Sequence, residues 1–174
     1  EGYAPKAMYS NLANAVSATD IRRSVIIFAD GTDKYKSKKF LELPNNDEDV
    51  VYCRAAEAYL IEAEALARSG DESGARQVLF NLVSKRDPKY VLSTNSGDAL
   101  IEEILLQKRI ELWAEGRSYF DLKRLKRGID RNVAGSNHRL DAMLNIPAND
   151  KRWVLAIPMS EIDNNPNIVL DENQ

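Results

Sequence analysis

The fold of this chain is decided by residues 51–69, which read VYCRAAEAYLIEAEALARS. The stretch holds no glycine or proline, and six of its residues are alanine, the best helix former. Apolar side chains nearly encircle the helix that it predicts, so this helix should pack against neighbours on more than one side. Gly70 follows where a helix commonly ends. We therefore expect a long helix from about residue 50 to Ser69.

A second helix is predicted directly after Gly70. Asp71 can cap its start, and the apolar residues that follow have the spacing of one helical face, namely Ala75, Val78, Leu79, Leu82 and Val83. Pro88 ends the pair. The two helices have the spacing of one tetratricopeptide unit, in which the small Ala63 and Ala75 permit close approach, although a generic helical hairpin fits about equally well. One such unit cannot bury its own outer face, so other helices or a missing N-terminal part must cover it.

The other segments are shorter or less regular. Residues 1–49 mix short apolar runs with polar breaks and are expected to be irregular. Further helices are predicted from Asp98 to about Glu115 and around Ser118 to Lys126. Glycines and prolines limit regular structure in residues 127–174, where residues 153–157 (WVLAI) should form a short buried anchor. The predicted fold is mostly α, with a tetratricopeptide-like hairpin, further helices and a loop-rich C-terminal wrap.

Length and composition bound the organisation. A chain of 174 residues with 44% hydrophobic residues can bury one core, so 1–174 is expected to be a single domain or a fragment. Within it we expect an irregular region (1–49), a helical core (50–126) and a C-terminal wrap (127–174). The first residue is Glu1 rather than methionine, which suggests a processed or partial chain. No apolar stretch approaches the roughly 18 residues that span a bilayer.

Charge argues against a nucleic-acid partner. A net charge of -3 is small and has the wrong sign for a general attraction to phosphates. Residues 123–127, KRLKR, form the most basic run, but basic side chains near a helix C-terminus complement the helix dipole. The run also lacks interleaved aromatic residues, so we interpret it as a solvated face.

Several charges lie inside otherwise well-packed predicted helices, namely Arg54, Glu57, Glu64, Arg109, Glu111, Glu115, Asp121 and Arg124. Glu111 and Glu115 are four residues apart and share a helix face, as an acid and a base would in glycoside hydrolysis. A structural ion-pair lattice is favoured, because arginines interleave these carboxylates and a paired carboxylate has a lowered pKa. We therefore expect Glu111 and Glu115 to pair with arginines such as Arg54 or Arg109.

Other catalytic and metal chemistry finds little support. The single histidine, His138, excludes a histidine-rich zinc site and suits a loop. Residues 45–49, NNDED, could hold calcium but lack the spacing of an EF-hand loop, so a solvated turn is favoured. Cys53 has no histidine nearby in the sequence and is expected to be an inert core thiol. The prediction is a protein that is not an enzyme, with no catalytic residues, no metal site and no cofactor.

Particular residues then carry a family resemblance. Residues 54–65, RAAEAYLIEAEA, closely resemble the long-helix signature of the SusD/RagB family. Similar elements of the family follow in the same order, at Lys108–Leu112, Glu115–Arg117, Phe120–Arg124, Ile157–Ile162 and Asn164–Asn167. One departure is Gln107, which stands where the family commonly has a glutamate and which should weaken one ion pair. Residues 50–170 carry the resemblance clearly, and family members are considerably longer.

The resemblance implies the C-terminal portion of a nutrient-binding lipoprotein. Such a protein lies on the outer face of the outer membrane, lipid-anchored through an N-terminal part absent from this chain, and closes over a TonB-dependent, SusC-like transporter. It implies capture of an oligosaccharide or other nutrient without catalysis. The alternative is a tetratricopeptide-like protein-interaction scaffold. The identity of the nutrient, the ligand-binding residues and the oligomeric state are left open.

This chain alone is expected to bind glycans weakly or not at all. Sugar faces are commonly held by exposed aromatic side chains, whereas Trp113 and Trp153 lie in apolar settings that favour the core. Tyr3, Tyr9 and Tyr35 of the irregular region are possible contacts.

Overall fold

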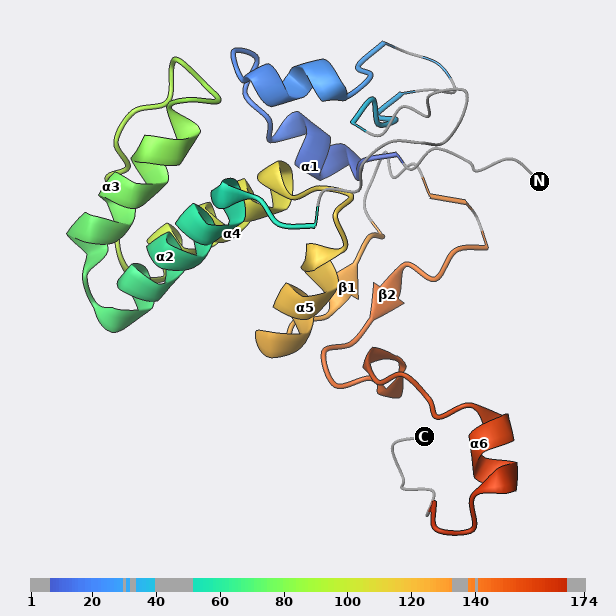
Figure 1. Ribbon diagram of the computed structural model, residues 1–174. Helices are drawn as coiled ribbons and strands as arrows, with labels where there is room; N and C mark the ends of the chain where they lie inside the picture. The colour runs from blue at the N-terminus through green and yellow to red at the C-terminus, as the bar shows by residue number, and fades with distance from the viewer. Residues whose placement is uncertain are drawn as a thin grey trace. The chain divides into compact units, whose positions relative to one another are not determined.

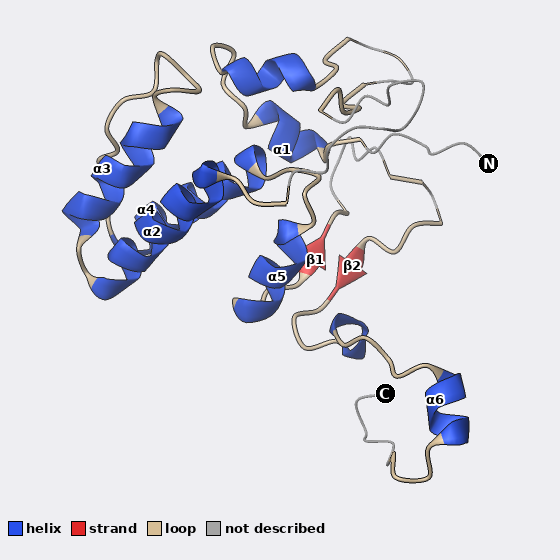
Figure 2. Ribbon diagram, in the orientation of Figure 1, coloured by secondary structure: helices blue, strands red, loops and turns tan. Residues whose placement is uncertain are grey.

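The structure is a computed structural model that describes residues 7–29, 31, 34–39, 52–132, 138–139 and 141–168. The chain divides into two compact units, Glu1–Ser118 and Tyr119–Gln174, which are described separately. Helices dominate, as predicted, and Figures 1 and 2 show a single small pair of strands in the described part of the chain. The organisation as one domain or a fragment stays a prediction.

The predicted hairpin is formed by α2 (Ala55–Ser69) and α3 (Glu72–Val83). Gly70 joins them with a φ of 94°, a left-handed conformation that glycine adopts without steric cost. The Asp71 side chain accepts a hydrogen bond from the Gly74 amide at 2.9 Å, so it caps α3 as expected.

The core of the first unit lies where α4 (Gly97–Glu111) packs against both hairpin helices. Ala63 and Ala75 are fully buried there, in one cluster with Leu60, Leu79, Leu100 and Ile104. Both alanines therefore lie where close packing leaves no room for a larger side chain.

Two helix boundaries differ from the prediction. The first helix begins at Ala55 rather than near residue 50, because Arg54 has an extended backbone (φ -131°, ψ 140°). The third ends at Glu111 rather than Glu115, and Ala114 adopts a positive φ of 65°. Both ends meet in the ion-pair cluster described below, so tertiary contacts set them rather than helix propensity.

The first region is less irregular than predicted. It contains α1 (Ser10–Asn14) and the 3-10 turn η1 (Ile21–Val25). A second apolar cluster joins this region to the end of α4 and contains Met8, Leu12, Ala13, Val16, Ile26, Tyr35 and Ile110. A helix of five residues is too short to produce a recognisable apolar period, which explains why the sequence did not predict it.

The second unit contains most of α5 (Arg117–Arg124), the antiparallel strands β1 (Ile129–Asp130) and β2 (Asn145–Ile146), the turn η2 (Lys151–Trp153) and α6 (Met159–Asn164). Trp153 is buried as predicted, and its Nε1 donates to the Pro147 carbonyl at 2.6 Å. The rest of the predicted anchor is wrong, because Leu155 is 86% exposed. Within the described residues, no helix is long and apolar enough to cross a membrane.

Candidate functional site

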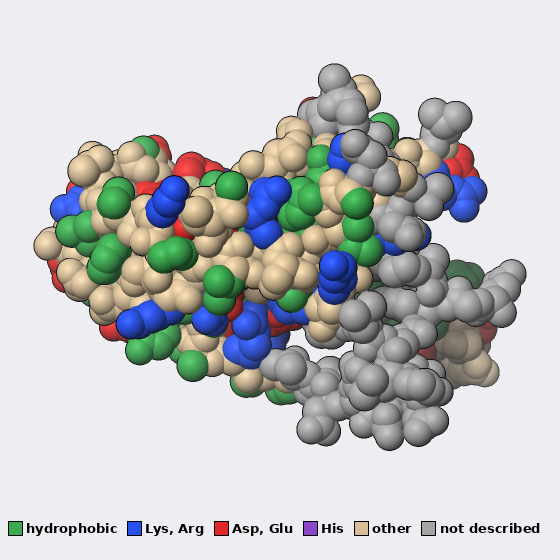
Figure 3. Space-filling model, turned by 90° about the horizontal axis from the view of Figure 1, so that it is seen from above, with side chains coloured by type: hydrophobic (Ala, Val, Ile, Leu, Met, Phe, Trp, Pro, Cys, Tyr) green, Lys and Arg blue, Asp and Glu red, His purple; other side chains and the backbone are tan. Residues whose placement is uncertain are grey.

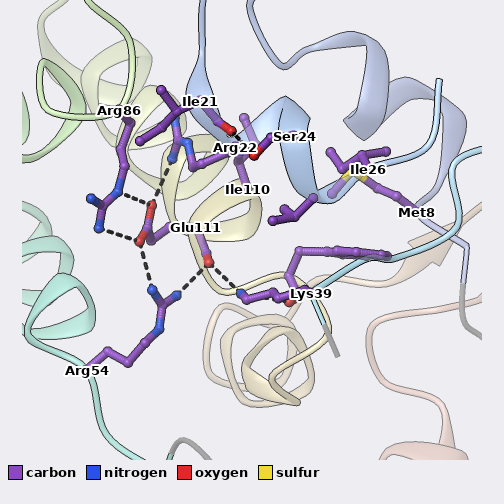
Figure 4. A pocket seen from close by; sticks show the side chains of 12 residues that line it. Met8, Ile21, Arg22, Ser24, Ile26, Lys39, Arg54, Arg86, Ile110 and Glu111 are labelled. Carbon is purple, nitrogen blue, oxygen red and sulfur yellow. Dashed lines mark hydrogen bonds and ion pairs between the residues drawn. The ribbon is translucent and has the colours of Figure 1, made fainter. Parts of the chain in front are cut away.

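Glu111, the last residue of α4, is the centre of a buried ion-pair cluster (Figure 4). It is only 4% exposed, and its carboxylate oxygens accept hydrogen bonds from three guanidinium groups. Arg54 Nη1 lies at 2.9 Å, Arg86 Nη2 at 3.0 Å and Arg22 Nη1 at 3.3 Å. Every oxygen of this carboxylate is therefore occupied by a cationic donor.

Glu115 completes the cluster four residues further along the chain, beyond the end of α4. Its carboxylate binds Arg54 Nη2 at 2.7 Å and also pairs with the Lys39 ammonium. The same Lys39 Nζ donates to the backbone carbonyls of Glu111 at 3.0 Å and Trp113 at 3.2 Å. The last carbonyls of a helix have no partner within the helix, so Lys39 and the nearby Arg54 supply the missing donors.

Arg22 connects the N-terminal region to the same cluster. Its Nη2 contacts Asp20 Oδ2 at 2.6 Å and Gln107 Oε1 at 2.7 Å. Gln107 thus keeps a hydrogen bond to arginine, while the full ion pair that a glutamate would make is absent. We call the set the Glu111 cluster, and its members are Asp20, Arg22, Lys39, Arg54, Arg86, Glu111 and Glu115.

Electrostatics decide between acid–base chemistry and a structural role. Burial alone would raise the pKa of Glu111, but the hydrogen bond and charge of Arg86 and the charges of Arg22 and Arg54 outweigh burial and lower it. A general acid needs a raised pKa, so Glu111 is unsuited to protonating a leaving group. The predicted pairing of Glu111 and Glu115 with Arg54 is confirmed.

The other helical carboxylates follow the same pattern. Ion pairs join Glu57 to Arg117 at 3.3 Å, Glu64 to Arg68 at 2.8 Å and Asp121 to Arg124 at 2.8 Å. These contacts support the structural lattice that the sequence favoured.

A pocket of about 270 Å³ opens beside the Glu111 cluster. Its charged wall consists of Arg22, Lys39, Arg54, Arg86 and Glu111, and the remainder is mostly apolar, with Met8, Ile21, Val25, Ile26, Ile110 and Trp113. Figure 4 shows the charged groups turned toward Glu111. Because they bind one another, the wall serves the packing of the first unit.

The structure places the cysteine and the tyrosines considered in the sequence analysis in different surroundings. Cys53 is exposed and precedes α2, so its assignment as a core thiol is wrong, because the helix begins two residues later than Cys53. Tyr35 is buried in the second apolar cluster and donates to Asn14 Oδ1 at 3.1 Å, which removes it as an exposed sugar contact. Tyr9 is half-buried, whereas Tyr3 lies outside the described residues.

Two further interpretations of the sequence concern metal binding and nucleic-acid binding. The predicted turn at residues 45–49 lies outside the described residues. In the part of the chain that the structure describes, no group of three histidine, cysteine or acidic side chains could hold a metal ion. Lys123 and Arg124 are exposed, in line with a solvated basic face. On the face in Figure 3, basic and acidic side chains are interspersed with hydrophobic ones.

Comparison with known proteins now identifies the family. A mostly α fold with a tetratricopeptide-like hairpin defines a broad class of helical proteins. A family model described as the SusD family matches residues 27–174, and this chain belongs to that family. A search of curated proteins gives no match.

Solved structures give the same assignment. A SusD-like carbohydrate binding protein from Bacteroides vulgatus is 27% identical with a TM-score of 0.76, over 93% of this chain and 41% of that protein. A SusD superfamily protein from Bacteroides thetaiotaomicron is 27% identical with a TM-score of 0.71, over 92% of this chain and 38% of that protein. A SusD superfamily protein from Bacteroides fragilis is 27% identical with a TM-score of 0.71, over 87% of this chain and 34% of that protein. The chain thus spans about two fifths of the length of these proteins or less.

Proposed function

We propose that this chain is part of a non-catalytic glycan- or nutrient-binding component of an outer-membrane uptake system, which acts with a TonB-dependent transporter. The observation that carries the proposal is membership of the SusD family, together with similarity to a carbohydrate binding protein at 27% identity over 93% of the chain. We place the protein on the outer face of the outer membrane, held there by a lipid anchor.

The absence of catalysis is supported by the state of the two carboxylates that could have served as acid and base. Glu111 is held by three arginines, and Glu115 by Arg54 and Lys39. A glycosidase needs one protonated carboxyl group and a second that faces the sugar. Neither condition suits a carboxylate that is enclosed by cations.

A capture experiment tests this function. A longer form of the protein, of the length of its solved relatives, would be tagged, expressed in a Gram-negative host with its neighbouring genes, and purified in mild detergent. We expect a TonB-dependent transporter to copurify, and calorimetry to show oligosaccharide binding without release of shorter sugars. Recovery without a transporter, or sugar hydrolysis that Glu111→Gln abolishes, would contradict the proposal.

The second candidate is a tetratricopeptide-like scaffold for another protein. The observation that favours it is that two apolar residues of α2, Tyr59 and Ile61, are exposed. An exposed apolar helix face is a common protein-docking surface. Capture of a soluble partner in place of a transporter, with binding lost in Tyr59→Glu, would favour this alternative.

A further inference from the structure

A second hollow, of about 360 Å³, lies at the loop between α3 and α4, apart from the residues of the Glu111 cluster. Its polar lining includes Asp87, Lys89, Tyr90, Thr94, Asn95 and Glu103. Small-molecule sites commonly measure about 300–1,000 Å³, so the hollow suits a small ligand rather than a long polymer. Nothing in the packing of the first unit, as described above, uses this space.

Side-chain contacts hold the loop in place. Glu103 on α4 accepts hydrogen bonds from Tyr90 Oη at 2.7 Å, from Asn95 Nδ2 at 2.8 Å and from the Ser93 hydroxyl. Arg76 Nη1 on α3 donates to the Asn95 carbonyl at 2.9 Å. A loop that is ordered before binding pays less conformational entropy when a ligand arrives.

Several polar groups of this rigid loop keep unused hydrogen-bonding capacity. In the described part of the chain, neither the Thr94 hydroxyl nor Asn95 Oδ1 makes a hydrogen bond. A carboxylate can accept about four hydrogen bonds, and Glu103 accepts three. Thr94, Asn95 and Glu103 offer acceptors, and the Thr94 hydroxyl and the Lys89 ammonium offer donors, so a ligand rich in hydroxyl groups, which both donate and accept, matches this lining.

Charge narrows the class of ligand further. The lining holds two carboxylates, Asp87 and Glu103, against one ammonium group, that of Lys89. An anionic ligand would meet repulsion, whereas a neutral polyol would not. The ring of Tyr90, stacked on Phe80 with a centroid distance of 6.2 Å, adds an aromatic wall of the kind that sugar faces contact.

We propose that this hollow is a weak subsite for a neutral saccharide, in which Thr94, Asn95 and Glu103 bind sugar hydroxyl groups. The inference rests on the proposed function and names the part of this chain that touches the sugar. A shallow site with few free polar groups predicts weak affinity. This agrees with the expectation that the chain alone binds glycans weakly.

Nuclear magnetic resonance on the 174-residue chain tests the subsite. The 15N-labelled chain would be titrated with the methyl pyranosides of glucose, galactose and mannose, and with methyl glucuronide as the acidic counterpart. We expect saturable shifts at the amides of residues 89–95 and 103 with at least one neutral sugar. Methyl glucuronide should bind several-fold more weakly than methyl glucoside if glucose is that sugar, because its carboxylate replaces the C6 hydroxymethyl group and so brings a negative charge and one hydroxyl donor fewer.

Thr94→Val tests the role of a single side chain in sugar binding. Thr94 is exposed and its hydroxyl makes no hydrogen bond that the fold needs, so the substitution should leave the fold intact. Affinity should fall about fivefold, as expected for one lost hydrogen bond, with the melting temperature unchanged. Ser160→Ala removes a hydroxyl from an exposed residue of the second unit and should leave affinity unchanged.

Three results would overturn the subsite: no shift at the loop with any neutral sugar, equal binding of the glucuronide, or unchanged affinity in Thr94→Val. The proposed function can be separated from these results. If a longer form of the protein binds oligosaccharides while the loop shows no shift, the inference fails and the function stands. If neither form binds any sugar, both the subsite and glycan binding as the proposed function fail.

Discussion

At the scale of single residues, Glu111 and Glu115 differ in how many positive charges would lose their carboxylate partner if each were replaced. In the part of the chain that the structure describes, Glu111 is the only carboxylate that binds Arg86, and it is shared with Arg22 and Arg54. Without Glu115, in contrast, Arg54 keeps Glu111, and Lys39 keeps two backbone carbonyls. Removing one partner of a buried pair is costly mainly because it strands the other charge.

We therefore expect Glu111→Gln to lower the free energy of unfolding by about 3–5 kcal/mol. Glu115→Gln should cost less, about 1.5–3 kcal/mol, as expected for hydrogen bonds to charged groups. Urea denaturation would measure both, with the exposed Glu62→Gln as the control that stays close to the parent. Equal stability of all three variants would show that the cluster contributes nothing.

The lowered pKa of Glu111 also predicts how stability depends on pH. A carboxyl group whose pKa is lower in the folded state stabilises the fold at a pH above its unfolded value, here 4.5. That contribution disappears as pH falls through the folded pKa. Thermal melts between about pH 6 and pH 3 should show a smaller loss for Glu111→Gln than for the parent. Parallel curves would argue against a lowered pKa.

At the scale of secondary-structure elements, the α2–α3 hairpin depends on small side chains. Ala63 has no exposed surface and lies within the core cluster of the first unit. Ala63→Leu should overpack this contact and lower the free energy of unfolding by about 1–3 kcal/mol. Ala65→Leu makes the same change at an exposed position of the same helix and should be nearly neutral. Similar denaturation midpoints for both variants would contradict the packing described here.

The end of α4 shows that residues from distant segments can set the boundary of a helix. Helix α4 ends where Lys39 and Arg54 reach its last carbonyl groups. Sequence periodicity placed this end four residues later, because Leu112 continues the apolar stripe. Donors from distant segments can therefore end a helix that local propensity would extend.

At the scale of the whole molecule, the length of the relatives bears on ligand affinity. The chain spans 41% of the carbohydrate binding protein from Bacteroides vulgatus. We expect a longer form of the protein to bind an oligosaccharide at least tenfold more tightly than this chain, because further contacts of about 1.4 kcal/mol suffice for that ratio. Calorimetric titration of both forms with the same panel measures the ratio. Equal affinities would place the main site within these 174 residues.

The sequence by itself determined the helical class, the hairpin at Gly70 and the structural role of Glu111 and Glu115. Apolar period, caps and interleaved charges are local properties that neighbouring residues reveal. Only the tertiary structure decided which cations reach Glu111, since Arg22, Arg54 and Arg86 lie 89, 57 and 25 residues away along the chain. Among 24 lysines and arginines, no spacing rule selects these three. The hollow near Glu103 could not be predicted from the sequence for the same reason. It exists only once the folded chain brings α4 against residues 90–95.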